Sequence, residues 1–105
     1  MSATLDLVAA GRIYCDLVFA GLDAAPAPGR EVYAGALTIA AGGGAFITAA
    51  YAAALGMKAG LAGVLPAPPF DAPVQAGAAA LGILALVTPA PAGTDPQITA
   101  AIVAG

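Results

Sequence analysis

The sequence contains no histidine, and only one of its 105 residues is a cysteine. Without histidine the chain lacks the commonest general base and the commonest metal ligand, and it cannot form a Ser-His or Cys-His nucleophile pair. The lone Cys15 cannot form a disulfide within the chain, and it excludes a zinc site built from cysteines. Any chemistry carried out by this chain therefore depends on its six acidic side chains.

Charged side chains are scarce, with six acidic and three basic residues and a net charge of −3. The basic residues Arg12, Arg30 and Lys58 are far apart in the sequence, so no basic patch is expected. Nucleic-acid binding rests on clustered Lys and Arg and is therefore not expected. The N-terminus has no basic segment typical of a secretory signal, and we expect a cytoplasmic protein.

Residues 32–57 contain no charged side chain, and this length is sufficient to span a bilayer. The segment is nevertheless rich in Gly and Ala, poor in Leu, and interrupted by three consecutive glycines. We therefore expect no membrane span, and a small Ala/Gly-rich membrane protein is kept only as the third alternative.

The chain is organised around the turn Gly42-Gly43-Gly44. The flanking residues predict a strand over 31–39, a helix that ends at Gly56, and a strand over 58–65, which together form one βαβ unit. The expected buried face of the helix comprises Phe46, Ile47, Ala50, Ala54 and Leu55. Without Cβ atoms the turn admits a close ligand or backbone. It is neither a P-loop nor a dinucleotide fingerprint, and phosphate binding, polyol binding and simple close packing all stay open.

The remaining apolar segments complete an alternating order of strands and helices. A first strand is expected over 5–11, ending at a glycine, and residues 12–19 follow it with side chains that alternate between two sides. Further strands are expected over 83–87 and 97–104, a helix over 72–81 capped by Asp71, and Pro/Gly-rich loops over 21–30, 66–71 and 88–96. The order strand, strand, helix, strand, helix, strand, loop, strand predicts an α/β fold with a largely parallel sheet. Asp16 then lies at the carboxyl end of the first strand, where ligands bind in open α/β sheets, although composition alone favours an ordinary turn or capping aspartate.

Several short motifs, taken in order, resemble the N-terminal part of the ribokinase-like (PfkB) carbohydrate kinases. They are Gly11-Arg12-Ile13-Tyr14-Cys15-Asp16-Leu17, Pro28-Gly29-Arg30-Glu31, Gly42-Gly43-Gly44-Ala45-Phe46-Ile47-Thr48-Ala49, Leu55-Gly56 and Gly63-Val64-Leu65. The resemblance extends along essentially the whole chain. It implies an α/β sandwich with a small β lid over the sugar site, and the lid would come from the segments around residues 17–19, 31–39 and 97–104.

The resemblance also implies an activity, the transfer of the γ-phosphoryl group of ATP, with Mg²⁺, to a hydroxyl of a sugar or nucleoside. Asp16 matches the aspartate that binds substrate hydroxyls, and Gly42 and Gly43 match the glycine pair on the sugar side of the site. A homodimer through the lid strands is left open. Residues 1–105 would be the N-terminal substrate-binding part, and the C-terminal nucleotide-binding and catalytic half, with its ATP and Mg²⁺ sites, would lie outside this chain.

Three departures from the family pattern limit what the resemblance implies. Ile47 stands where the family often has an asparagine that reaches the sugar, which leaves open a more apolar or differently held substrate. Pro68-Pro69-Phe70-Asp71 replaces Asp-Pro-Phe-Gly, and the Gly-Ala-Gly-Asp segment that supplies the catalytic base and the anion hole is not in the sequence.

Phosphoryl transfer needs the nucleophile, the metal and the phosphates to be positioned together. We therefore expect no catalytic, cofactor-binding or metal-binding residue in this chain, and no activity from the chain in isolation. It is either the sugar-binding portion of a kinase or an inactive truncated remnant that acts at most as a sugar-binding or dimerising module. An incomplete α/β fold exposes a sheet edge and apolar faces, so the isolated chain should be marginally stable or oligomeric.

Overall fold

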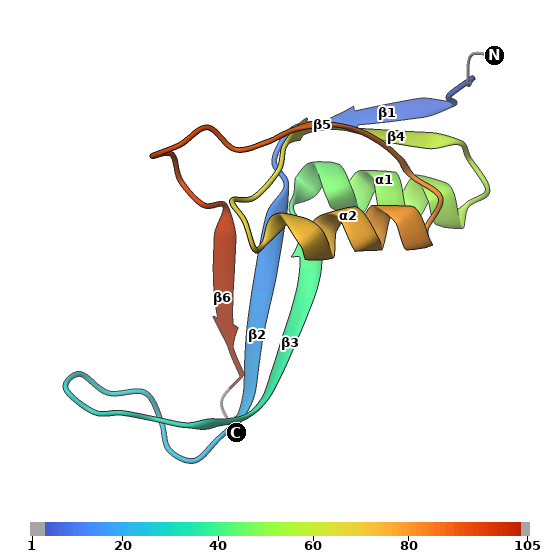
Figure 1. Cartoon of the computed structure of the whole chain (residues 1–105). Helices are drawn as coiled ribbons and strands as arrows, with labels where there is room; N and C mark the ends of the chain where they lie inside the picture. Colours follow the sequence, from blue (N-terminus) through green and yellow to red (C-terminus); the bar gives the residue numbers. More distant parts are fainter. Residues whose placement is uncertain (1–3, 104–105) are drawn as a thin grey trace.

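The computed structural model describes residues 4–103, which form two three-stranded sheets and two helices (Figure 1). The elements are β1 (Leu7–Ala10), β2 (Tyr14–Leu22), β3 (Ala34–Gly42), α1 (Gly44–Ala54), β4 (Ala59–Val64), α2 (Asp71–Ala80), β5 (Leu84–Thr88) and β6 (Ile98–Ile102). The sheet β1-β4-β5 is parallel, and both helices lie against the same face of it. The sheet β3-β2-β6 projects away from this layer, and we name the two the core sheet and the lid sheet.

The hydrophobic core lies between the core sheet and the helices. At its centre Leu61 of β4 and Ala49 of α1 are fully buried, and Val74 of α2 is 1% exposed. Small alanine side chains on α1 allow the helix to lie close to the sheet. The α/β fold class and the parallel pairing predicted from the sequence are confirmed for this layer.

The predicted buried face of α1 is wrong in part. Phe46 is buried as expected, but Ile47 is 50% exposed and Leu55 is 80% exposed. The helix instead buries Ala45, Ala49 and Ala52 beside Phe46. These alanines share one face of the helix, but alanine is too weakly hydrophobic to outweigh isoleucine and leucine in a sequence pattern.

The first strand ends at the predicted glycine, since β1 covers Leu7–Ala10 and Gly11 follows it. The chain breaks at Gly11, Arg12 and Ile13, where it passes from the core sheet into the lid sheet. Asp16 is therefore near the start of β2 in the lid, and the expected position at the carboxyl end of a first strand is wrong. The crossing is tightly packed, because a Cβ atom at Gly63 would lie 2.7 Å from the Gly11 carbonyl oxygen.

The predicted central βαβ unit is also wrong. The strand before α1, β3, pairs antiparallel with β2 in the lid sheet, whereas β4 pairs parallel with β1 in the core sheet. The βαβ unit is instead β4-α2-β5, whose strands are parallel neighbours. Local patterning correctly placed the strand, turn and helix, but it holds no information on which sheet a strand joins.

The lid sheet is formed by the segments that the resemblance assigned to it. β2 pairs antiparallel with β3 from Tyr14↔Gly42 to Leu22↔Ala34, and parallel with β6 from Cys15↔Ile98 to Phe19↔Ile102. Side chains alternate between the faces, so Asp16 lies with Thr99 on one face while Leu17 and Phe19 lie on the other. Residue 104 of the predicted last strand lies outside the described residues.

Both helices end at a glycine with left-handed backbone, as predicted, at Gly56 with φ +87° and at Gly82 with φ +69°. The predicted cap of α2 is wrong, because Phe70 occupies the N-cap position and makes no side-chain capping bond. Asp71 is instead the first helical residue, where its negative charge still favours the helix dipole. Within residues 4–103 no helix is long and apolar enough to cross a membrane.

Candidate functional site

Asp16 lies on the central strand of the lid sheet, on the face that it shares with Thr99 of β6. The Thr99 hydroxyl donates a hydrogen bond of 2.5 Å to Asp16 Oδ1. An ionised carboxylate has about four acceptor sites, so this bond leaves most of the acceptor capacity of Asp16 for other donors. The side chain is only partly buried, which leaves the carboxylate accessible to the hydroxyls of a ligand.

Gly42 provides the space that the Asp16 carboxylate occupies. A Cβ atom on Gly42 would overlap Asp16 Oδ2 and would lie 2.7 Å from Asp16 Cγ. Real Cβ atoms essentially never approach a neighbour this closely, so a larger residue at this position would displace the carboxylate. Glycine is required here for space rather than for backbone freedom.

The other two glycines of the turn have different roles. Gly43 has φ +91°, and a Cβ atom there would lie 2.5 Å from the Arg12 carbonyl oxygen, which accepts a 3.2 Å hydrogen bond from the Ala45 amide. Gly44 begins α1 and has open space where its Cβ would be. The structure thus requires glycine at Gly42 and Gly43, the pair that the resemblance singled out, and not at Gly44.

Ile47, the fourth predicted site residue, lies in the first turn of α1 and donates its backbone amide to the Gly43 carbonyl at 3.0 Å. Its half-exposed side chain has no hydrogen-bonding group. The structure therefore brings Asp16, Gly42 and Gly43 together and places Ile47 one helical turn beyond them. The sequence analysis missed Thr99, although it is the hydroxyl-bearing residue of a strand assigned to the lid.

Cys15 points to the face of β2 opposite Asp16 and is completely buried. Burial, with a smaller contribution from the charge of Asp16, raises the pKa of the Cys15 thiol above its ordinary value of 9.0. The thiol is therefore protonated at neutral pH and acts as a small apolar side chain rather than a nucleophile.

A shallow cavity of about 460 Å³ opens where β1 and β4 end. Arg12 and Gln97 line it together with small residues, among them Gly11 and Gly63. The Arg12 guanidinium donates a 3.1 Å hydrogen bond to the Tyr14 hydroxyl. Arg12 thus places a positive charge at the carboxyl ends of β1 and β4, close in sequence to Asp16.

The described residues do not fit Mg²⁺ or the phosphates of ATP. Within residues 4–103 no three His, Cys, Asp or Glu side chains gather into a group that could hold a metal ion. The glycine turn lacks the Lys and Ser/Thr of a phosphate-binding loop.

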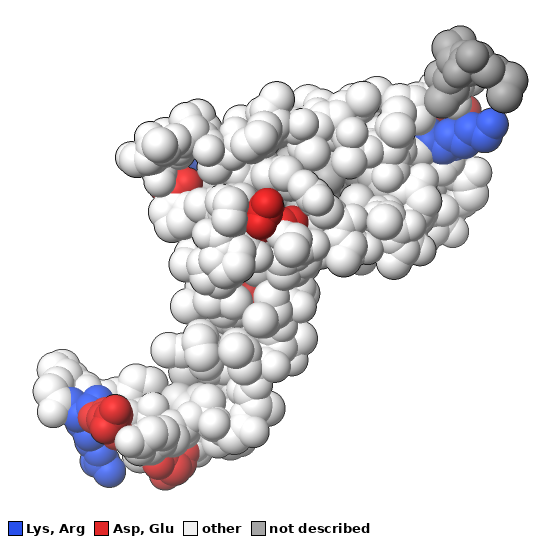
Figure 2. Space-filling model, in the orientation of Figure 1, with Lys and Arg blue, Asp and Glu red and all other residues white. Residues whose placement is uncertain are grey.

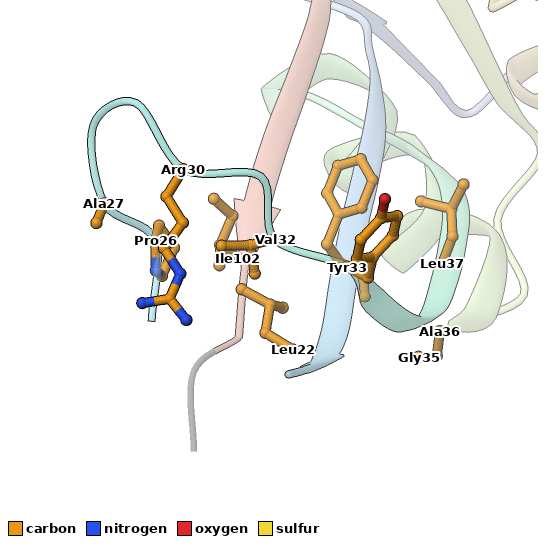
Figure 3. A pocket seen from close by; sticks show the side chains of 12 residues that line it. Leu22, Pro26, Ala27, Arg30, Val32, Tyr33, Gly35, Ala36, Leu37 and Ile102 are labelled. Atoms are coloured by element: carbon orange, nitrogen blue, oxygen red, sulfur yellow. The ribbon is translucent and has the colours of Figure 1, made fainter. Parts of the chain in front are cut away.

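A second cavity, of about 610 Å³, lies at the far end of the lid (Figure 3). Phe19, Leu37 and Ile102 contribute to its mainly apolar lining, and they belong to the face opposite Asp16. Arg30 and Tyr33 also line it. Figure 2 shows blue and red atoms together at this tip of an otherwise largely uncharged surface.

No protein-family model matches the sequence, and no curated protein is similar to it in sequence. The fold, in contrast, is similar to that of solved kinases. A carbohydrate kinase from Agrobacterium tumefaciens has a TM-score of 0.77 at 18% identity, over 92% of this chain and 31% of that chain. A nucleoside kinase from Methanocaldococcus jannaschii, an archaeal member of the ribokinase family, has a TM-score of 0.66 at 18% identity, over 82% and 29%. Ribokinase from Cryptococcus neoformans in complex with ADP has a TM-score of 0.60 at 24% identity, over 79% and 26%.

These similarities establish the fold. The chain has the α/β architecture of the ribokinase-like kinases, and it spans between 26% and 31% of the length of these three structures, consistent with an N-terminal portion. The predicted resemblance is thus confirmed at the level of fold. At these identities the likeness does not carry the activity, which is argued below from the site.

Proposed function

We propose that this chain, residues 1–105, is the N-terminal substrate-binding part of a cytoplasmic ATP-dependent kinase that phosphorylates a hydroxyl of a sugar or nucleoside. The observation that carries the proposal is the Asp16 carboxylate, which fills the space left by Gly42 and is held by Thr99. Hydrogen bonds from hydroxyls to a carboxylate are charge-assisted and roughly twice as strong as neutral ones. The kinases with the same fold, one of them solved with ADP, support ATP as the phosphoryl donor.

In this proposal Asp16 accepts hydrogen bonds from two substrate hydroxyls and so orients the ring. Gly42 and Gly43 let the ring approach the backbone, and Ile47 contacts its less polar side. The catalytic base, ATP and Mg²⁺ would be held by residues outside this chain. The alternative is that this polypeptide is a catalytically inactive truncated remnant, which acts at most as a sugar-binding or dimerising module.

Asp16→Ala is expected to weaken the binding of the preferred sugar or nucleoside at least tenfold, because a hydrogen bond to a charged group contributes about 1.5–3 kcal/mol. Calorimetric titration of the purified chain with a panel of sugars and nucleosides first identifies the ligand and then compares the variants. Asp71→Asn is the matched control, since it removes a carboxylate from α2 rather than from the lid. A folded chain that binds no member of the panel, or an Asp16→Ala variant that binds as tightly as the wild type, would contradict the proposal.

We further propose that the apolar face of the lid sheet forms a homodimer. Leu37, Ile39 and Ile102 are 52%, 48% and 55% exposed and share this face, and a contiguous exposed apolar patch is typical of an interaction surface. In a two-fold dimer the same patch meets itself. The tip carries both signs of charge, since Arg30 lines its cavity beside Tyr33 and the Tyr33 hydroxyl donates to Glu31, so opposite charges can face each other.

Leu37→Asp is expected to convert this dimer to monomer and to raise its dissociation constant at least tenfold, since each buried leucine contributes about 1.5–3 kcal/mol. Thr38→Asp is the control, because the adjacent residue of β3 points to the opposite face. Sedimentation equilibrium measures both variants. A wild-type monomer at high concentration, or equal dissociation by the two variants, would exclude this interface.

A further inference from the structure

Gln97 has an unusual backbone conformation. Between residues 4 and 103 it is the only residue other than glycine with a positive φ, which is +58°. The left-handed region disfavours residues with a side chain, and such residues persist only where the surrounding contacts hold them. They concentrate at ligand clamps and other functional sites, so the contacts of Gln97 need an explanation.

The side-chain amide of Gln97 joins three segments that are distant in sequence. Its Nε2 donates to the Ile13 carbonyl at 3.0 Å and to the Val64 carbonyl at 2.8 Å. An amide nitrogen has two hydrogens, so both are used. Ile13 immediately precedes β2 of the lid, Val64 is the last residue of β4 in the core sheet, and Gln97 itself immediately precedes β6.

The backbone around Gln97 is fixed as well. The backbone amide of Gln97 donates to Asp95 Oδ1 at 2.9 Å, and its backbone carbonyl accepts from the Cys15 backbone amide at 3.1 Å. The neighbouring Pro96 carbonyl accepts from the Ala67 amide at 3.0 Å. The chain thus enters β6 with its position fixed against both the lid sheet and the segment between β4 and α2.

This position determines which side chain meets Asp16. The register pairs Cys15 with Ile98 and Asp16 with Thr99, two residues after Gln97. A slip of one residue would turn Thr99 to the opposite face and leave an apolar side chain beside Asp16. We infer that Gln97 is a positioning residue, which locks β6 in register and holds the lid against the core so that the Thr99 hydroxyl reaches the Asp16 carboxylate.

The inference deepens the proposed function and rests on it only for the ligand, so its first test needs no ligand. Gln97→Gly keeps the left-handed backbone without strain and removes the side-chain amide that donates the two hydrogen bonds. Gln97→Glu keeps the length of the side chain but replaces the donor with a carboxylate, which cannot donate to the two carbonyl oxygens. Both variants are expected to raise the hydrogen-exchange rates of lid amides, the Cys15 amide among them, by roughly tenfold or more, while amides of the core sheet exchange as in the wild type.

Gln75→Glu, on the exposed surface of α2, is the matched control and should change neither sheet. A merely structural role would instead raise exchange in both sheets together, because global stability would fall. That outcome, or lid exchange unchanged in Gln97→Gly, would overturn the assignment.

The second test uses the ligand found by calorimetry in a cycle of Gln97→Gly and Thr99→Val. If Gln97 acts through Thr99, each single variant weakens binding about tenfold and the double variant is no weaker than the worse single one. Additive losses would show that Gln97 acts independently of Thr99 and would overturn the inference. If the wild type binds no polyol, the proposed function fails, whereas the exchange experiment still decides the role of Gln97.

Discussion

Gly42→Ala is expected to abolish detectable polyol binding, with an affinity loss of at least about a hundredfold, or about 2.8 kcal/mol. The added methyl group would occupy the position of the Asp16 carboxylate, with its Cγ at 2.7 Å. The carboxylate would have to rotate away, which breaks its hydrogen bond with Thr99 and removes it from the ligand. Overpacking of this kind also costs about 1–3 kcal/mol of folding stability. Calorimetric titration measures the affinity and thermal unfolding measures the stability.

Gly44→Ala is the matched control for this prediction, since it adds the same methyl group two residues away. Apart from its chain neighbours and the nearby backbone of the helix itself, no atom lies within 4 Å of the added Cβ, and Gly44 is the first residue of α1. Ligand affinity should stay within twofold of the wild type, and stability should be unchanged or raised by up to about 1 kcal/mol, because alanine favours a helix over glycine. If Gly42→Ala and Gly44→Ala bind equally well, Asp16 is not the group that holds the ligand.

The parts of the site that depend on local sequence could be predicted. A strand that runs into consecutive glycines and then into an alanine-rich helix specifies its turn with no help from distant residues. The same holds for the glycine C-caps at Gly56 and Gly82, where only the left-handed backbone is required. The motifs around Asp16 and Gly42 also predicted which segments form the lid sheet, because their order along the chain resembles that of a known family.

The parts that depend on pairing between distant segments could not be predicted. Nothing near Asp16 in the sequence indicates that Thr99 is its partner, because 83 residues separate them and the register of β6 is fixed by contacts of Gln97. The end of the first strand at Gly11 was predicted, but the passage of the chain into a second sheet at that point was not. Only the pairing of β1 with β4, and of β2 with β3 and β6, shows that the chain changes sheet there.

The face of the core sheet opposite the two helices is open within residues 4–103. All-parallel sheets are almost always covered on both faces, whereas within residues 4–103 both helices lie on one face. On the other face Val8, Leu84 and Leu86 are 49%, 43% and 47% exposed. These side chains are close neighbours across the sheet, since Val8 and Leu84 both flank Gly60 and the Leu86 side chain lies 3.5 Å from where a Gly60 Cβ would be.

We expect the isolated chain to self-associate through this face beyond the dimer formed by the lid. Combining Val8→Lys, Leu84→Lys and Leu86→Lys should remove species larger than a dimer and raise the soluble concentration at least about tenfold, because charge on an exposed apolar patch opposes association. Light scattering and sedimentation velocity measure the size distribution. A wild-type chain that stays monomeric or dimeric at high concentration, with a sharp thermal transition, would contradict this expectation.

Leu55→Lys separates a specific interface from a general effect of added charge. Leu55 is 80% exposed at the end of α1, on the helical side of the molecule, so its replacement adds charge without touching the open face. It should leave the large species in place, and Leu37→Asp should remove the dimer without removing them. If single lysines at any exposed apolar position dissolve the large species equally well, low net charge causes the association, and the uncovered sheet face does not.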